Sequence, residues 1–169
     1  MLLVGGASTR FSSPKALVQF DGEMLAERAW RLLGDACDER VAVGKAADAL
    51  ELPFDLVDDG TKLRAPIAGL VAGLRAARHD VVVVVPVDMP LLTVAALHAL
   101  ADECRDAAVP ATGPLPGAYR KQILPFLEHA VAEGCLSLRD AIAPLAVAVV
   151  DLDPALLANV NTPADVQRL

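Results

Sequence analysis

The pattern of hydrophobic positions along the chain is clearest at Val81–Val85, where five valines follow one another. A half-buried strand shows a polar residue at every second position, and this run has none. The run therefore predicts a strand buried on both faces, as in a parallel sheet that helices cover on both sides. It ends at Pro86, and Asp88 follows where the carboxyl end of the strand would lie.

Shorter apolar runs predict further strands, at Met1–Val4, Arg40–Val43, Phe54–Val57, Ala107–Val109 and Val147–Leu152. Helical spacing of apolar residues and helix-capping signals predict helices, at Met24–Leu33, Pro66–Arg78, Thr93–Cys104, Gln122–Ala132, Leu138–Ala143 and Pro163–Leu169. Gly34 is expected to end the first helix, and Phe126 is expected to face the core. The residues between Ala111 and Gly117 are rich in Pro and Gly, so they are interpreted as a loop.

The alternation of strands and helices predicts an α/β fold with a mostly parallel sheet and helices on both of its faces. The 169 residues suit one domain, so residues 1–169 are expected to form a single unit. In such a sheet, ligands bind outside the carboxyl ends of the strands. The functional residues are therefore expected in the loops that follow the apolar runs.

Composition narrows the function classes. Hydrophobic residues make up 54% of the chain, but the run Val81–Val87 is far shorter than the ~20 residues of a membrane-spanning helix. No charged and apolar leader precedes a cleavage site, so the protein is expected in the cytoplasm and away from membranes. The net charge of −7 argues against a generic nucleic-acid binder. The three cysteines and three histidines are scattered, which disfavours disulfides and zinc sites.

The first predicted strand leads into Gly5 and Gly6, and Ser8, Arg10 and Lys15 follow. Glycines let the backbone approach a ligand closely, and successive amides with two cations can hold phosphate oxygens. The spacing fits neither the dinucleotide-binding nor the P-loop fingerprint. A plain loop with two solvated cations therefore remains an alternative to a phosphate site.

Two further loops carry carboxylates. Asp88 could hold Mg²⁺, which prefers one or two carboxylates together with substrate phosphates, or it could simply cap the next helix. Asp58 and Asp59 could bind sugar hydroxyls or a base edge, or they could only start the turn at Gly60.

Near the carboxyl terminus, a helix cap explains Thr162-Pro163 but not the two asparagines Asn159 and Asn161.

In chain order, these segments resemble the nucleotidyltransferases of the molybdenum cofactor pathway. LVGGASTRFSSPKAL is similar to the family pattern L-x-G-G-x-S-x-R-x-G-x-x-K, and VVPVDMPLLT is similar to C-D-M-P. PIAGLVAGLRAA is similar to G-P-L-A-G, and AYRKQILPFLEHAVAEGCLSLRDAI to A-Y-R-x-x-L-L-P. NVNTPADV is similar to N-x-N-T-P-E-D-L. The match is collinear and spans the chain. It resembles the molybdenum cofactor guanylyltransferase family most closely, which implies a Rossmann-like three-layer α/β sandwich of the nucleotidyltransferase type.

The resemblance implies a reaction in which the terminal phosphate of molybdopterin attacks the α-phosphate of GTP and pyrophosphate leaves. It implies Mg²⁺ as cofactor, GTP and molybdopterin as ligands, and transient contact with other proteins of that pathway. It assigns residues by role: nucleotide binding to Leu3, Gly5, Gly6, Lys15, Asp59 and Asp88; catalysis to Arg10, Lys15 and Asp88; the metal to Asp88; and the pterin side to Asn159 and Asn161. Gly44 falls where some members carry a base-contacting asparagine.

Three positions depart from the family pattern: Ser12 and Ala65 replace glycines, and Pro14 replaces an aspartate. These departures leave a non-catalytic nucleotide-binding or cofactor-handling module as one alternative. The other is the CTP-dependent cytidylyltransferase branch, whose loop resembles L-A-A-G where this chain has Gly5-Gly6. A sugar-phosphate nucleotidyltransferase is disfavoured by the N-x-N-T-P ending.

Overall fold

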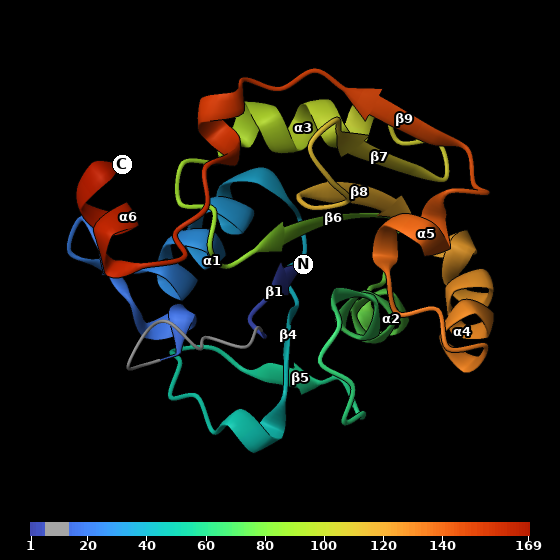
Figure 1. Cartoon of the computed structure of the whole chain (residues 1–169), viewed down its shortest axis with the longest axis horizontal. Helices are drawn as coiled ribbons and strands as arrows, with labels where there is room; N and C mark the ends of the chain where they lie inside the picture. Colours follow the sequence, from blue (N-terminus) through green and yellow to red (C-terminus); the bar gives the residue numbers. More distant parts are fainter. Residues whose placement is uncertain (6–13) are drawn as a thin grey trace.

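The computed structural model describes residues 1–5 and 14–169, and within them a seven-stranded sheet forms the centre of the molecule (Figure 1). The strand order is β5-β4-β1-β6-β8-β7-β9. The strands are β1 (Leu2–Leu3), β4 (Ala42–Gly44), β5 (Leu56–Asp58), β6 (Val81–Pro86), β7 (Ala107–Pro110), β8 (Gly117–Arg120) and β9 (Val147–Val150).

The sheet is mostly parallel, as the sequence predicts. Strand β1 lies between β4 and β6 and runs parallel to both. Strand β5 extends this parallel group beyond β4, and β8 is antiparallel to its neighbours β6 and β7. The carboxyl ends of β1, β4, β5 and β6 therefore open at the same edge of the sheet.

Helices cover both faces of the sheet (Figure 1). Their bounds are α1 (Leu25–Ala36), α2 (Pro66–Ala76), α3 (Val94–Asp102), α4 (Leu124–Ala132), α5 (Leu138–Ile142) and α6 (Pro163–Arg168). Short 3-10 helices are η1 (Lys15–Leu17), η2 (Ala46–Asp48), η3 (Lys121–Ile123) and η4 (Pro154–Leu157). The Thr93 hydroxyl accepts a hydrogen bond from the backbone of Ala96 and so caps α3, as expected.

The valine strand is buried on both faces, which confirms the sequence prediction. Val83 and Val85 pack into one core with α1 and α3. Val82 and Val84 point the other way, into a second core with α2 and α4. Because successive side chains of a strand alternate in direction, one apolar run supplies both cores and fixes β6 in the centre of the sheet.

One strand of the central sheet and a separate hairpin were not predicted. Residue Gly117, expected to end a loop, begins strand β8, which pairs with β6 and β7. A small antiparallel hairpin joins β2 (Gln19–Phe20) to β3 (Glu23–Met24). Asp21 and Gly22 make its turn with φ of 50° and 80°, the left-handed values that an Asp-Gly hairpin turn requires.

Two smaller expectations are wrong. Helix α1 continues through Gly34 to Ala36. A Cβ at Gly34 would lie 2.8 Å from Nη1 of Arg40, whose guanidinium stacks on the Trp30 ring, so the glycine makes room for that side chain. Phe126 is exposed to solvent at 38%, because α4 turns Leu127 toward the core instead.

None of the helices in the described part of the chain is both long and apolar enough to cross a membrane. The cytoplasmic location expected from the sequence stays a prediction.

Candidate functional site

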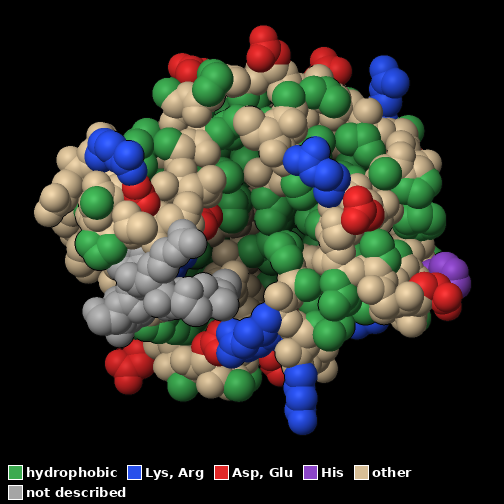
Figure 2. All heavy atoms as spheres, in the orientation of Figure 1, with side chains coloured by type: hydrophobic (Ala, Val, Ile, Leu, Met, Phe, Trp, Pro, Cys, Tyr) green, Lys and Arg blue, Asp and Glu red, His purple; other side chains and the backbone are tan. Residues whose placement is uncertain are grey.

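A cavity of about 370 Å³ lies at the carboxyl ends of β1, β4 and β6, where the fold predicts a ligand site. Its walls come from those strand ends and from the segment that leads into α2. The lining residues are Leu3, Val4, Gly5, Lys15, Val43, Gly44, Lys45, Asp59, Leu63, Arg64, Ala65, Pro66, Gly69, Pro86, Val87, Asp88, Met89, Leu115 and Asn159. Figure 2 shows this face hollowed near its centre, with hydrophobic side chains inside and Lys and Arg side chains around it.

Close packing of α2 against β1 shapes the floor of the cavity. A Cβ at Gly69 would lie only 2.8 Å from Cδ2 of Leu3. Glycine therefore lets the helix approach the strand, and both residues line the cavity.

One side of the cavity holds a cluster of three polar side chains from distant parts of the sequence. Lys15 lies in η1, Asp88 follows β6, and Asn161 precedes α6. The Lys15 ammonium donates to Oδ2 of Asp88 at 2.8 Å and to Oδ1 of Asn161 at 2.6 Å. The backbone of Val160 donates to the Asp88 carbonyl at 2.8 Å, which holds the two loops side by side.

The start of α6 fixes Asn161 in this position. Thr162 caps α6, which confirms the helix cap expected at Thr162-Pro163, and it forms a reciprocal capping box with Asp165. The Asp165 carboxylate also accepts the backbone N–H of Asn161 at 2.9 Å. This bond, followed by those from Thr162, lowers the pKa of the Asp165 carboxyl below its ordinary value of about 3.8. The ionised carboxylate thus orients the loop that carries Asn161.

The oxygens of this cluster suit a hard cation. Asp88 Oδ2 and Asn161 Oδ1 both accept hydrogen bonds from the Lys15 ammonium, so a positive charge already lies between these two oxygen atoms. Mg²⁺ prefers such donors together with substrate phosphates, and the Asp88 side chain is 22% exposed at the cavity. Within residues 1–5 and 14–169 there is no group of three or more His, Cys, Asp or Glu side chains that could hold a metal alone. A metal here would therefore take its remaining ligands from water or from a bound anionic ligand.

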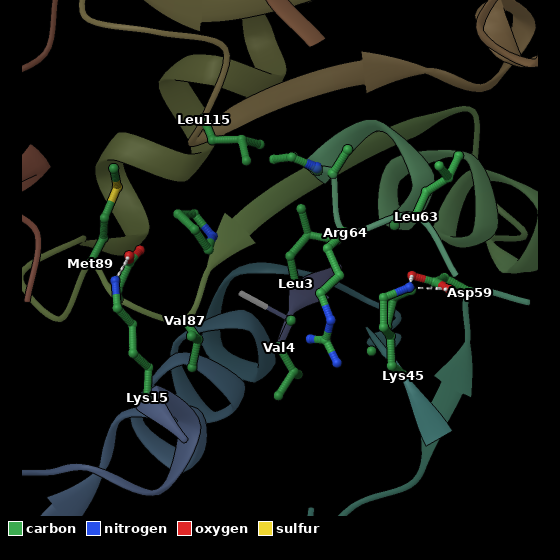
Figure 3. A pocket seen from close by; sticks show the side chains of 18 of the residues that line it. Leu3, Val4, Lys15, Lys45, Asp59, Leu63, Arg64, Val87, Met89 and Leu115 are labelled. Atoms are coloured by element: carbon green, nitrogen blue, oxygen red, sulfur yellow. Dashed lines mark hydrogen bonds and ion pairs between the residues drawn. The ribbon is translucent and has the colours of Figure 1, made fainter. Parts of the chain in front are cut away.

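A second polar pair lines the other side of the cavity, where β4 and β5 end. The Lys45 ammonium donates to both carboxylate oxygens of Asp59, at 3.0 and 2.8 Å, and to the Thr61 carbonyl at 2.8 Å. Figure 3 shows Lys45 and Asp59 on one side of Leu3 and Lys15 on the other. The strand order agrees, because β1 lies between β4 and β6.

Arg64 lines the cavity from the loop before α2 and is exposed to solvent. Its guanidinium bonds to the Asp48 carboxylate at 2.7 Å, and this hydrogen bond raises the pKa of Arg64 above its ordinary value. The cation is therefore held at the rim, where an anionic ligand entering the cavity would meet it.

The structure brings together most of the site residues named in the sequence analysis. Those that line the cavity are Leu3, Gly5, Lys15, Asp59, Asp88 and Asn159, and Asn161 is bonded to Lys15. Gly6 and Arg10 lie outside the described residues.

Sequence reasoning missed Lys45. The available signal was its position directly after a predicted strand, beside Gly44.

Comparisons with known proteins agree with this geometry. The family described as "MobA-like NTP transferase domain" matches residues 1–149. The chain belongs to this family. It is therefore a nucleotidyltransferase, which confirms the enzyme class and the α/β fold expected from the sequence.

Two curated relatives and one solved structure match nearly the whole chain. A probable molybdenum cofactor guanylyltransferase from Chloroflexus aggregans is 33% identical, over 99% of this chain and 90% of the relative. A molybdenum cofactor guanylyltransferase from Pseudomonas putida is 33% identical, over 99% of this chain and 94% of the relative. The crystal structure of molybdopterin-guanine dinucleotide biosynthesis protein A from Archaeoglobus fulgidus superposes with a TM-score of 0.81 at 26% identity, over 99% and 94% of the two chains.

Proposed function

We propose that this protein transfers GMP from GTP to the terminal phosphate of molybdopterin and releases pyrophosphate, in a Mg²⁺-dependent reaction carried by residues 1–169 as one nucleotidyltransferase domain. The names of the curated relatives support the choice of GTP and acceptor. The observation that carries the proposal is the pairing of Lys15 with Asp88 at the cavity. Lys15, which would bind phosphate, and Asp88, which would bind the metal, thus lie side by side in the cavity.

The reaction asks the protein mainly to position charged groups, because the acceptor phosphate is itself the nucleophile. An acceptor oxygen forms a bond to the α-phosphorus, the bond from that phosphorus to the bridging oxygen breaks, and pyrophosphate leaves with the electron pair. Gly5 and Gly6 would present backbone amides to the phosphates, and Arg10 and Lys15 would neutralise their charge.

Asp88, with the Asn161 carbonyl oxygen beside it, would hold Mg²⁺ together with phosphate oxygens. The metal would stabilise the negative charge that grows on the phosphates during transfer. Lys15 would turn from the carboxylate toward the triphosphate.

The two ends of the cavity suggest how the substrates are arranged. Asp59 lies on the side of β4 and β5 and would face the nucleoside, and Leu3, on the central strand β1, lines the cavity between Asp59 and Lys15. Asn159 and Asn161 lie beside Lys15 and Asp88, on the side that would face the pterin. The acceptor phosphate and the α-phosphate of GTP would therefore meet near Lys15.

Calorimetric titration with Mg²⁺ and each of GTP, CTP and ATP tests the choice of nucleotide. The proposal expects clear preference for GTP. Preference for CTP would assign the protein to the cytidylyl branch with the same fold and mechanism. Binding of GTP without any pyrophosphate formation in the presence of molybdopterin would favour a non-catalytic module and would direct attention to Ser12, Pro14 and Ala65.

A further inference from the structure

The Lys45–Asp59 pair is almost closed off from solvent although both residues line the cavity. The Lys45 side chain is 10% exposed and the Asp59 side chain is 7% exposed. Three acceptor atoms surround the ammonium, which matches its three N–H bonds. A buried ion pair adds little net stability compared with apolar side chains of the same volume. Its position in the wall of a ligand cavity is therefore more informative than its contribution to folding.

The backbone holds the pair in place from both strands. The Asp59 N–H donates to the Gly44 carbonyl at 3.0 Å, and the Thr61 N–H donates to Oδ1 of Asp59 at 3.1 Å. Lys45 directly follows Gly44, which has no side chain of its own to offer at the end of β4. Lys45 thus supplies the donor groups at this end of the cavity, and Asp59 supplies the acceptors.

We propose that Lys45 is a specificity-determining residue that reads the O6 oxygen of guanine while Asp59 accepts the N1–H and N2–H groups of the same base. The inference rests on the proposed function, because it places the triphosphate beside Lys15 and Asp88. The nucleoside then extends across β1 toward the ends of β4 and β5, where Figure 3 shows the pair.

The hydrogen-bond capacity of the pair suits guanine. A carboxylate offers about four acceptor positions, and Asp59 uses two on Oδ1 and one on Oδ2 for the partners named above. The longer of the two Lys45 hydrogen bonds to Asp59 goes to Oδ1. If Lys45 donates this N–H to guanine O6 instead, a second acceptor position on Asp59 becomes open. Asp59 can then accept both N1–H and N2–H. The ammonium keeps three acceptors throughout, so guanine enters without leaving a buried donor unsatisfied.

Other bases meet repulsion at the same place. Adenine presents its N1 lone pair to the carboxylate and its amino group to the ammonium. Cytosine can direct its O2 toward the ammonium and its amino group toward the carboxylate, but its N3 lone pair then faces the carboxylate where guanine presents N1–H. Specificity that relies on such mismatched polar groups is strong, because the buried groups of the site would then go unpaired.

Replacing the oxygen that Lys45 is proposed to read tests the inference. The 6-thio analogue of GTP keeps N1–H and N2–H but offers sulfur, a weak acceptor, in place of O6. Calorimetry should show that the wild-type protein binds GTP about tenfold to a hundredfold more tightly than the 6-thio analogue. In Lys45→Met this ratio should fall close to one, because no donor remains to distinguish oxygen from sulfur.

Two further variants complete the design. Lys62→Met removes an exposed lysine from the same loop region and should keep the wild-type ratio. Should Lys45→Met not fold because Asp59 is left unpaired, Lys45→Met with Asp59→Asn removes both charges and should give the same ratio near one. The wild-type protein alone already tests the inference. A ratio near one between its affinities for GTP and for the 6-thio analogue overturns it.

The outcomes separate the inference from the function on which it rests. Failure of the wild-type protein to bind GTP contradicts the proposed function and the inference together. Binding of GTP with a ratio that Lys45→Met leaves unchanged contradicts the role of Lys45 alone, since a purely structural lysine would weaken both nucleotides equally. A ratio that falls only in the Lys45 variants supports the role of Lys45.

Discussion

Lys15 and Asp88 are joined by an ion pair with 2.8 Å between Nζ and Oδ2, although 73 positions separate them in the sequence. Asn161, from near the carboxyl terminus, binds the same ammonium. The fold thus gathers three polar residues at one end of the cavity. In the proposed reaction, the Lys15 ammonium lies between the Asp88 and Asn161 oxygens before the substrates bind. It would turn to the phosphates when Mg²⁺ and the nucleotide bind.

Lys15→Met should weaken triphosphate binding and lower kcat/KM by about 10²–10³-fold, because a preorganised cation would be lost where negative charge grows. Steady-state kinetics with GTP and molybdopterin measure this change. Lys62→Met, which removes an exposed lysine, should leave kcat/KM within about twofold of the wild-type value, as is usual for surface changes. Equal losses in the two variants would show a general charge effect and contradict the role of Lys15.

Asp88→Asn should abolish Mg²⁺-dependent turnover and leave the fold intact. The free energy of unfolding should change by only about 1 kcal/mol or less, because the ion pair with Lys15 is partly exposed. Titrating Mg²⁺ into the variant in the presence of GTP should show no enhancement of GTP binding. A fully active Asp88→Asn enzyme would defeat the metal assignment, whatever its affinity for GTP.

The capping box of α6 should make stability depend on pH at the acid end. Hydrogen bonds from Asn161 and Thr162 lower the pKa of Asp165 in the folded state. The stabilisation is therefore complete above the ordinary pKa of about 3.8 and is lost as the pH falls through the lowered value.

Thermal unfolding measured between pH 2 and pH 7 checks the role of Asp165. Asp165→Asn should have a lower Tm than the wild type at pH 7, and the difference should shrink toward the acid end. A difference that stays constant over the whole range would mean that the ionised carboxylate is not responsible.

Gly117→Ala should destabilise the fold by about 1–3 kcal/mol, because overpacking forces neighbouring atoms to move. A Cβ there would lie 2.8 Å from the Pro114 carbonyl oxygen, which also accepts the hydroxyl hydrogen bond of Tyr119. Gly113→Ala is the matched control, since the atom nearest to its Cβ, Nη2 of Arg139, would lie 3.7 Å away. Chemical denaturation measures both variants, and equal stability of the two would contradict the packing argument.

The sequence predicts the sheet best where the apolar pattern has one interpretation. Five consecutive valines fit a strand buried on both faces, and from that strand the position of Asp88 at its carboxyl end follows. The Thr-Pro signal similarly predicts the start of α6.

Elements that depend on tertiary contacts were missed. Strand β8 begins at Gly117, inside a Pro- and Gly-rich stretch. It forms a strand because its backbone pairs with β6 on one side and with β7 on the other. Lys45 gains its position in the cavity from Asp59, which is supplied by the neighbouring strand. Neither pairing can be read from local spacing alone.

A product assay tests GMP transfer to molybdopterin directly. The purified protein is incubated with molybdopterin, Mg²⁺ and GTP, CTP or ATP in separate reactions, and pyrophosphate and the mass of the pterin product are measured together. We expect pyrophosphate and a guanine dinucleotide form of the pterin in equal amounts, with GTP only. Pyrophosphate-free reactions with all three nucleotides, or a cytosine dinucleotide from CTP, would contradict it.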